Sequence, residues 1–240
     1  QVGLEPGEPA TLRLESPFAL ERQLLALVPT YGVDPRRPGY AGFLAEALKE
    51  LAAEVPHKML ALFTAYETLA QSASALRELG LEPGMELLVQ SREGARAQLI
   101  ERFRAAPRAL LLGTASFWHG VDFPGEQLEL LAVTRLPFPV PTDPRVEALA
   151  ELLAEQGRSG FEERALPEAV LRFRQGIGRL IRRRSDRGVC VILDPRIVRA
   201  PYGQRFLDAL PAAPRGVDSP EALRAAVREW FAPRQGEDRS

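Results

Sequence analysis

Short apolar runs separated by helical patterns are the feature that most limits what this chain can fold into. The runs are three to six residues long, which suits a strand better than a helix. Nearly every position in them is apolar, as is typical of strands that are covered on both faces. We therefore expect strands over residues 59–63, 87–89, 109–112, 128–133 and 189–193.

Helical patterns alternate with these runs. An apolar position recurs every three or four residues between them, and Gly80 and Pro107 follow two of the segments as stop signals. Strands that alternate with helices predict an α/β fold, a parallel sheet with helices on both faces. The helices are expected over residues 43–55, 66–79, 92–106, 146–155 and 167 to about 184, with two more near 206 and over 222–230.

The carboxyl ends of the expected strands carry the polar residues. Ligands of parallel sheets bind beyond these ends. Here they lead into Thr64, into the segment from Thr114 to Asp122, and into the loop after Leu193.

Composition excludes several classes of protein. The single cysteine, Cys190, allows no disulfide framework and no four-cysteine metal site within the chain. Neither of the two lysines follows a glycine, so the chain holds no P-loop. No apolar run approaches the roughly 20 residues of a membrane span, and the start has no signal-peptide pattern. We expect a cytoplasmic protein without a membrane partner. The absence of an initiator methionine before Gln1 is consistent with a piece of a longer protein.

A net charge of −1 hides a strongly basic segment. Residues 172–187 contain seven arginines and one acid. If this segment is helical, Arg179 and Arg182 fall within roughly 40° of Gln175 on a helical wheel, opposite an apolar face. Two interpretations are open, a solvated face or a phosphate-binding face. Unpaired like charges on one helix face are destabilising, which favours an anionic ligand.

Two glycines in the same segment favour a ligand further. Gly176 and Gly178 each cost about 1 kcal/mol relative to alanine in a helix interior. Solvation does not explain that cost, whereas close approach of another backbone or a ligand does.

The segment 113–125 is rich in small residues and hydroxyls. Thr114 and Ser116 can donate to phosphate oxygens, and Asp122 can accept from a ribose hydroxyl or an arginine. The alternative is a buried turn in which Phe117 and Trp118 are core residues and Asp122 is a cap.

The remaining chemically notable residues have simpler interpretations. His57 and His119 have no carboxylate or cysteine at ligand spacing, so we expect them to be solvated or structural. Cys190 lies among valines and isoleucine and is most simply a core residue.

Three segments resemble motifs of superfamily 2 helicases. Residues 175–182, Gln-Gly-Ile-Gly-Arg-Leu-Ile-Arg, resemble motif VI, residues 113–125 resemble motif V, and residues 62–66 resemble motif IV. Three further sequences resemble the DinG branch of the XPD-like DNA helicases. They are Ser-Phe-Trp before Gly-Val-Asp-Phe-Pro-Gly, Leu-Pro-Phe at 136–138 and Asp-Pro-Arg at 194–196. His119 departs from this pattern, because many relatives carry glutamate there.

The resemblance implies the second of two RecA-like motor domains. Residues 1–38 would be a lead-in from the missing first domain, residues 39–212 the motor domain, and residues 213–240 a C-terminal helix and polar tail. The first domain would bind ATP and magnesium and, in many members, an iron–sulfur cluster that lies upstream of this chain.

The resemblance also implies roles for individual residues. Arg179 and Arg182 would act as arginine fingers on the γ-phosphate, with Gln175 as its sensor, and Gly120 and Asp122 would contact the nucleotide. Single-stranded DNA would run along Thr64, Thr114 and Ser116, helped by the charges of Arg92 and Arg96, in a 5′ to 3′ helicase.

The sequence has two alternative functional interpretations. One is a stand-alone nucleic-acid-binding module derived from a helicase half, without ATPase activity. The other is a Rossmann-type enzyme, which the sequence argues against because no Gly-x-Gly-x-x-Gly follows any expected strand.

Overall fold

A computed structural model describes residues 19–91, 96–118, 128–140 and 143–233. Within these residues seven strands form one sheet in the order β3-β4-β2-β5-β6-β1-β7, and every strand pair is parallel. The strands are β1 (Leu24–Pro29), β2 (Lys58–Leu62), β3 (Glu86–Val89), β4 (Ala109–Gly113), β5 (Leu130–Val133), β6 (Gly188–Ile192) and β7 (Pro214–Val217). The predicted α/β class and parallel sheet are confirmed.

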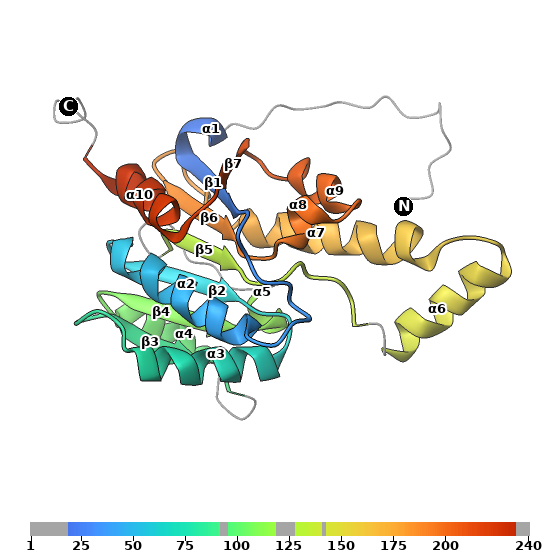
Figure 1. The fold of residues 1–240 in the computed structure, drawn as a ribbon, viewed down its shortest axis with the longest axis horizontal. Helices are drawn as coiled ribbons and strands as arrows, with labels where there is room; N and C mark the ends of the chain where they lie inside the picture. Colours follow the sequence, from blue (N-terminus) through green and yellow to red (C-terminus); the bar gives the residue numbers. More distant parts are fainter. Residues whose placement is uncertain (1–18, 92–95, 119–127, 141–142, 234–240) are drawn as a thin grey trace.

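Helices cover both faces of the sheet (Figure 1). Alternate residues of a strand point to opposite faces, so Leu60 and Leu62 enter one core and Met59 and Ala61 the other. The helical segments are α1 (Leu20–Gln23), α2 (Tyr40–Glu54), α3 (Tyr66–Leu79), α4 (Arg96–Ala105), α5 (Ala115–Trp118), α6 (Pro144–Glu155), the π-helical η2 (Phe161–Ala165), α7 (Leu166–Ile177), α8 (Arg196–Arg199), α9 (Gly203–Leu207) and α10 (Pro220–Phe231).

The two cores have different compositions. Helices α2, α3 and α10 bury mainly leucine and alanine on one face, at the three- and four-residue spacings of an apolar helix stripe. On the other face, phenylalanines of α4, α5, α7 and α9 fill the space against the strands. Their residues are Phe103, Phe117, Phe173 and Phe206.

Two strands come from segments that the sequence analysis placed outside residues 39–212. β1 lies between β6 and β7, pairing Leu24 with Gly188 and Ala26 with Pro214. β7 has only Val217 buried, so it carries no apolar pattern that would predict it. The sheet is therefore built from residues on both sides of the expected central domain.

The helix expected from residue 167 to about 184 is wrong beyond Ile177. α7 ends there, and turns follow as far as β6. Gly176 and Gly178 weaken the helix, and the buried Asp186 carboxylate accepts from the backbone N–H groups of Arg182 and Arg183, both at 2.8 Å. These bonds stabilise a folded loop in place of another helical turn.

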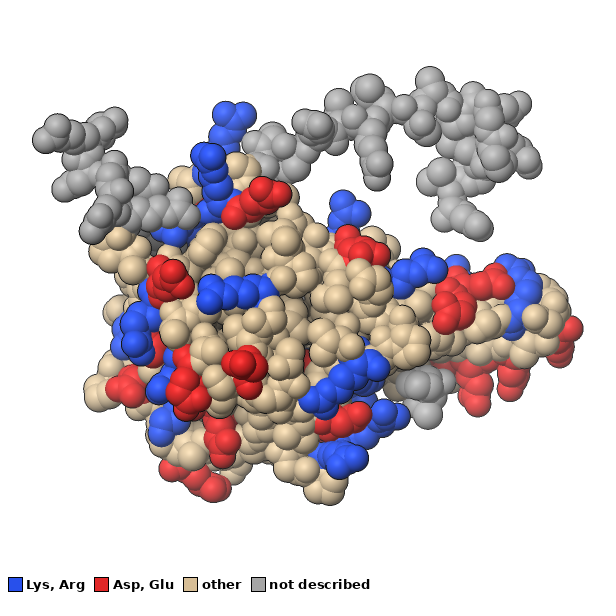
Figure 2. Space-filling view, turned by 45° about the horizontal axis from the view of Figure 1, so that its top comes forward, with Lys and Arg blue, Asp and Glu red and all other residues tan. Residues whose placement is uncertain are grey.

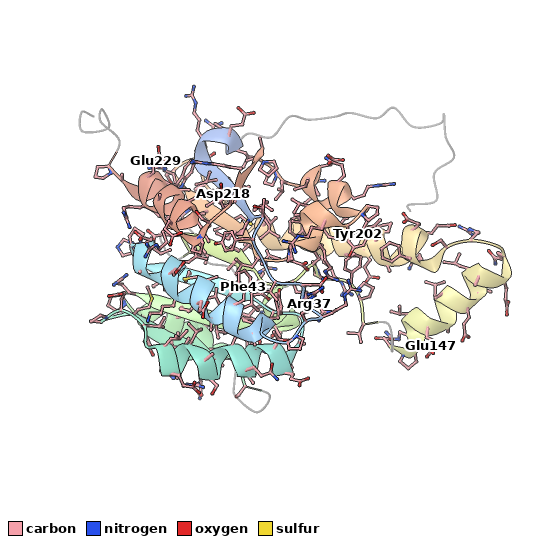
Figure 3. The ribbon with its side chains drawn as sticks, in the orientation of Figure 1. Arg37, Phe43, Glu147, Tyr202, Asp218 and Glu229 are labelled. Carbon is pink, nitrogen blue, oxygen red and sulfur yellow. The ribbon has the colours of Figure 1, made fainter. Side chains whose placement is uncertain are left out.

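An arm formed by α6, η2 and the start of α7 extends away from the sheet (Figure 1). Figure 3 shows Glu147 on α6 at a distance from the sheet, whereas Tyr202 lies beside the base of the arm. The Phe138 ring joins arm and body, with centroids 5.7 Å from Phe161 and 5.2 Å from Tyr202. None of the described helices is long and apolar enough to cross a membrane.

Candidate functional site

The carboxyl ends of β2, β4 and β3 lie side by side and form what we call the carboxyl edge. Thr114 follows β4 directly, and Gln90 follows β3 directly. The Phe63 N–H donates to Gly113 O at 2.8 Å, so Thr64 enters the loop next to Thr114. The structure therefore brings the expected DNA-contact residues Thr64, Thr114 and Ser116 to one edge.

Gln90, which the sequence analysis did not single out, organises this edge. Its Oε1 accepts from the Thr114 backbone N–H at 2.7 Å and lies 3.0 Å from Thr114 Oγ1. Its Nε2 donates to the Tyr66 hydroxyl and to Ser116 Oγ, both at 2.9 Å. The side chain is only 8% exposed. A polar residue directly after the apolar run 87–89 was the available signal for it.

Basic side chains near this edge are only partly described. The Arg96 guanidinium carbon lies 5.4 Å from the centroid of the Phe117 ring, so Arg96 sits beside α5, which carries Ser116. Arg92 lies outside the described residues. Phe117 is fully buried, as the alternative interpretation of this segment expected, while Ser116 is partly exposed.

The carboxyl ends of β5 and β6 form a second, tightly bonded part of the edge. The buried Asp194 carboxylate accepts from Leu136 N at 2.9 Å and from Arg196 N at 3.0 Å, and it pairs with the Arg196 guanidinium at 2.6 Å. Arg196 also lies over the Phe138 ring, 5.9 Å from its centroid. The Leu-Pro-Phe and Asp-Pro-Arg segments therefore form one structural unit.

The charge of Asp194 stabilises the charged form of Arg196 within this unit. Burial alone would lower the pKa of Arg196, but hydrogen bonds and the charge of Asp194 outweigh it and raise the pKa overall. Burial raises the pKa of Tyr40, whose hydroxyl donates to Thr134 O at the end of β5. Both groups keep their protons at neutral pH, so we assign them structural roles.

The arginines lie at the opposite, amino edge of the sheet. Residues 178–187, which we call the arginine loop, lead into the first residue of β6. Arg182 is exposed there, whereas Arg179 is only 7% exposed and Gln175 is exposed on α7. The single helix face expected to carry all three side chains does not form, because α7 ends before the two arginines.

The glutamine that ends α1, directly before β1, binds the backbone of the arginine loop. Gln23 is buried, and its Nε2 donates to the carbonyl oxygens of Arg183, Arg184 and Asp186 at 2.9, 3.0 and 2.9 Å. Asp186 holds the N–H groups of the same loop. The loop is thus held through its backbone, which leaves the side chains of Arg182, Arg183 and Arg184 exposed.

Gly178 does not lie at a close contact with another segment of backbone. A Cβ added there would meet only the carbonyl oxygens of Arg174 and Gln175, at 3.4 and 3.8 Å. The close approach of another backbone that we expected at Gly178 is therefore not found, and this glycine serves as the residue at which α7 ends.

Other residues from the sequence analysis prove structural or lie outside the described part. The His57 backbone N–H and ring Nδ1 contact the Glu129 carboxylate at 2.7 and 2.9 Å, which joins the amino ends of β2 and β5. Cys190 is fully buried in β6, and burial raises the pKa of its thiol to about 12. His119, Gly120 and Asp122 lie outside the described residues.

The face of the molecule in Figure 2 has no concentration of charge of one sign. On the face in Figure 2, basic and acidic side chains are interspersed over the body and the arm. Among the described residues no group of three or more His, Cys, Asp or Glu side chains could hold a metal ion. The two candidate sites are the arginine loop, with its exposed arginines, and the carboxyl edge, with its polar side chains. They lie at opposite ends of the strands.

An all-parallel sheet with helices on both faces and polar loops at its edges defines a RecA-like α/β domain. An apo XPD structure superposes with a TM-score of 0.61 at 18% identity, over 81% of this chain and 40% of that one. The C-terminal domain of the DEAD-box protein Dbp5 gives a TM-score of 0.53 at 14% identity, over 88% of this chain and 99% of that one. At these identities the likeness shows the fold.

Sequence comparison shows the family. Residues 48–213 match the helicase C-terminal domain family, and the chain belongs to it. The chain is 40% identical over 215 residues to the 3′-5′ exonuclease DinG of Bacillus subtilis (strain 168), covering 88% of this chain and 23% of that protein. It is 39% identical over 224 residues to the ATP-dependent DNA helicase YoaA of Escherichia coli (strain K12), covering 93% and 34%.

These relatives agree with membership of the helicase C-terminal domain family. The chain is a C-terminal domain of the DinG/XPD-like type, as the resemblance of motifs IV, V and VI implied. The ATP-dependent helicase DinG of Mycobacterium tuberculosis (strain ATCC 25618 / H37Rv) is 34% identical over 90% of this chain and 32% of that protein. The chain thus spans about a quarter to a third of the length of these relatives.

Proposed function

We propose that this chain is the second motor domain of an ATP-dependent DNA helicase that moves 5′ to 3′ along single-stranded DNA. A first RecA-like domain binds ATP, and this chain closes over it with the arginine loop. The observation that carries the proposal is that loop, in which Gln23 and Asp186 hold the backbone and leave arginine side chains exposed.

The arginine loop fits the anionic oxygens of a triphosphate. Arg182 presents an exposed, permanently charged guanidinium that can donate to two oxygens at once. Arg179 is buried, so its assigned role requires that domain closure opens its surroundings. Donation to the γ-phosphate stabilises the charge of the transition state, an effect worth about 10³ to 10⁵ in rate for arginine fingers.

The remaining assignments follow from the resemblance to helicase motifs. Gln175 senses the γ-phosphate, and Gly120 and Asp122, outside the described residues, contact the nucleotide. Magnesium belongs to the first domain in this scheme, where it would neutralise phosphate charge. Single-stranded DNA contacts the carboxyl edge at Thr64 and Ser116, with Arg92 and Arg96 adding electrostatic attraction. Thr114, expected as a third contact, lies at the same edge but is only 4% exposed.

Two measurements test the arginine assignment. The isolated 240-residue chain should show almost no ATPase activity, because it lacks a nucleotide-binding loop. In the longer protein, Arg182→Ala should lower ATP turnover by about 10³ while ATP binding to the first domain is retained. Arg145→Ala removes an exposed arginine from the arm and should leave turnover unchanged. Robust hydrolysis by the isolated chain, or near-normal turnover of Arg182→Ala, would refute the assignment.

The alternative is a stand-alone nucleic-acid-binding module without ATPase activity. The gene distinguishes the two. A reading frame that continues upstream of Gln1 through a Gly-Lys-Thr loop and an Asp-Glu box supports the motor. A start codon immediately before Gln1 supports the module.

A further inference from the structure

The orientation of the Gln90 amide is determined by its neighbours. A backbone N–H can only donate, so the atom 2.7 Å from Thr114 N is the carbonyl oxygen of Gln90. The NH₂ group therefore faces the Tyr66 hydroxyl and Ser116 Oγ, and both of these oxygens accept its hydrogens.

This orientation also decides what the two hydroxyls of the loop after β4 can do. The Oε1 of Gln90 is a pure acceptor, so Thr114 Oγ1, 3.0 Å away, donates its hydrogen inward. Ser116 Oγ, in contrast, accepts from Gln90, and this contact leaves the Ser116 hydroxyl hydrogen unused. Thr114 is only 4% exposed, whereas Ser116 is partly exposed.

We propose that Gln90 is a positioning residue that sets the donor direction at the carboxyl edge. It turns the Thr114 hydroxyl inward and presents the Ser116 hydroxyl as the donor to a DNA phosphate oxygen. A phosphate oxygen is a pure acceptor, so only a hydroxyl with an outward hydrogen can bind it. The inference rests on the proposed DNA-binding function, and of the two expected hydroxyl contacts in this loop it keeps Ser116 and removes Thr114.

A double-mutant cycle in the two-domain protein tests this role. Gln90→Glu keeps the shape of the side chain but replaces the NH₂ donor by an acceptor, which draws the Ser116 hydrogen inward. Binding of a 20-nucleotide oligo-dT strand is measured by fluorescence anisotropy at one salt concentration. We expect Ser116→Ala to weaken binding about tenfold in the wild-type background and less than twofold in the Gln90→Glu background.

Two controls separate the hydrogen-bond effect from charge and from misfolding. Gln71→Glu adds the same charge on the exposed face of α3 and should change affinity less than twofold. Thermal unfolding checks that each variant folds. If Gln90→Glu does not fold, Gln90→Asn takes its place, because its shorter side chain cannot span from Thr114 to Ser116.

The outcomes distinguish this inference from the proposed function. Equal losses for Ser116→Ala in both backgrounds would overturn the positioning role. No loss for Ser116→Ala in the wild-type background, with a loss for Thr64→Ala, would overturn it while the DNA edge stands. If neither Ser116→Ala nor Thr64→Ala weakens binding, the proposed DNA edge itself is wrong.

Discussion

Asp186 is the one acid in the arginine-rich segment, and its side chain binds the backbone of that segment. Its carboxylate accepts from two consecutive N–H groups while Gln23 binds carbonyl groups of the same loop. Both side chains are buried. The exposed arginines can thus repel one another without unfolding the loop, because its conformation depends on neutral and anionic groups beneath it.

Removal of this carboxylate should destabilise the chain measurably. Asp186→Ala leaves two N–H groups without their acceptor, at a cost of about 1–3 kcal/mol in the free energy of unfolding. Urea unfolding of the 240-residue chain measures it. Asp208→Ala removes an exposed carboxylate that accepts from the Gln204 side chain, and it should cost less than about 0.5 kcal/mol. Equal stabilities of the two variants would show that Asp186 does not hold the loop.

Two helical glycines differ in how much space surrounds them. Gly203, at the start of α9, lies so close to α8 that an added Cβ would be 2.1 Å from Ile197 O. Gly42, within α2, has nothing within 4 Å of such a Cβ. The first glycine allows α8 and α9 to pack against each other, and the second only weakens its helix.

The two glycines predict stability changes of opposite sign. Gly203→Ala should destabilise the chain by about 1–3 kcal/mol, because backbone atoms of α8 have to move. Gly42→Ala should stabilise it by about 0.5–1 kcal/mol through lower chain entropy in the unfolded state. Thermal or urea unfolding of both variants measures the signs. Changes of the same sign would contradict the packing assigned to α8 and α9.

The whole molecule places its two candidate sites at opposite edges of one rigid sheet. The carboxyl edge carries Gln90 and Ser116, and the amino edge carries the arginine loop, with parallel strands between them (Figure 1). β1 is essential to this frame, because it is the strand that joins β7 to β6 and because Gln23 precedes it. The frame therefore needs residues that precede the expected motor domain.

Truncation tests the need for β1. A chain that starts at Tyr40 loses Leu24, Leu27 and Val28 from the two cores. Burial of each of these side chains contributes about 1.5–3 kcal/mol to stability. The three contributions together are comparable with the roughly 5–15 kcal/mol stability of a typical domain. We expect no cooperative urea transition from it. A chain that starts at Ala19 keeps β1 and should unfold cooperatively. Cooperative unfolding of the shorter chain would show that residues 40–240 fold alone.

Local sequence was sufficient where an element carries its own pattern. α3 spans the predicted residues 66–79, and β2, β4 and β6 lie within a residue or two of the predicted runs, because periodicity and continuous apolar stretches are local properties. The residues of the motifs at 62–66, 113–125 and 175–182 also predicted the helicase C-terminal domain family. β7 was missed because its sequence, Pro-Arg-Gly-Val, contains no apolar run. β1 was missed although residues 24–28 form an apolar run like those of the predicted strands.

Only the tertiary structure decided how the two sites are built. α7 ends at Ile177 because Asp186 and the distant Gln23 stabilise the arginine loop, and no helical wheel contains those partners. Gln90 meets Thr114 and Ser116 because β3 and β4 are neighbours in the sheet. Hydrogen-bond direction depends on which groups meet in space. The sequence by itself therefore determined most of the elements and the family, and the fold determined which polar atoms come together at the two proposed sites.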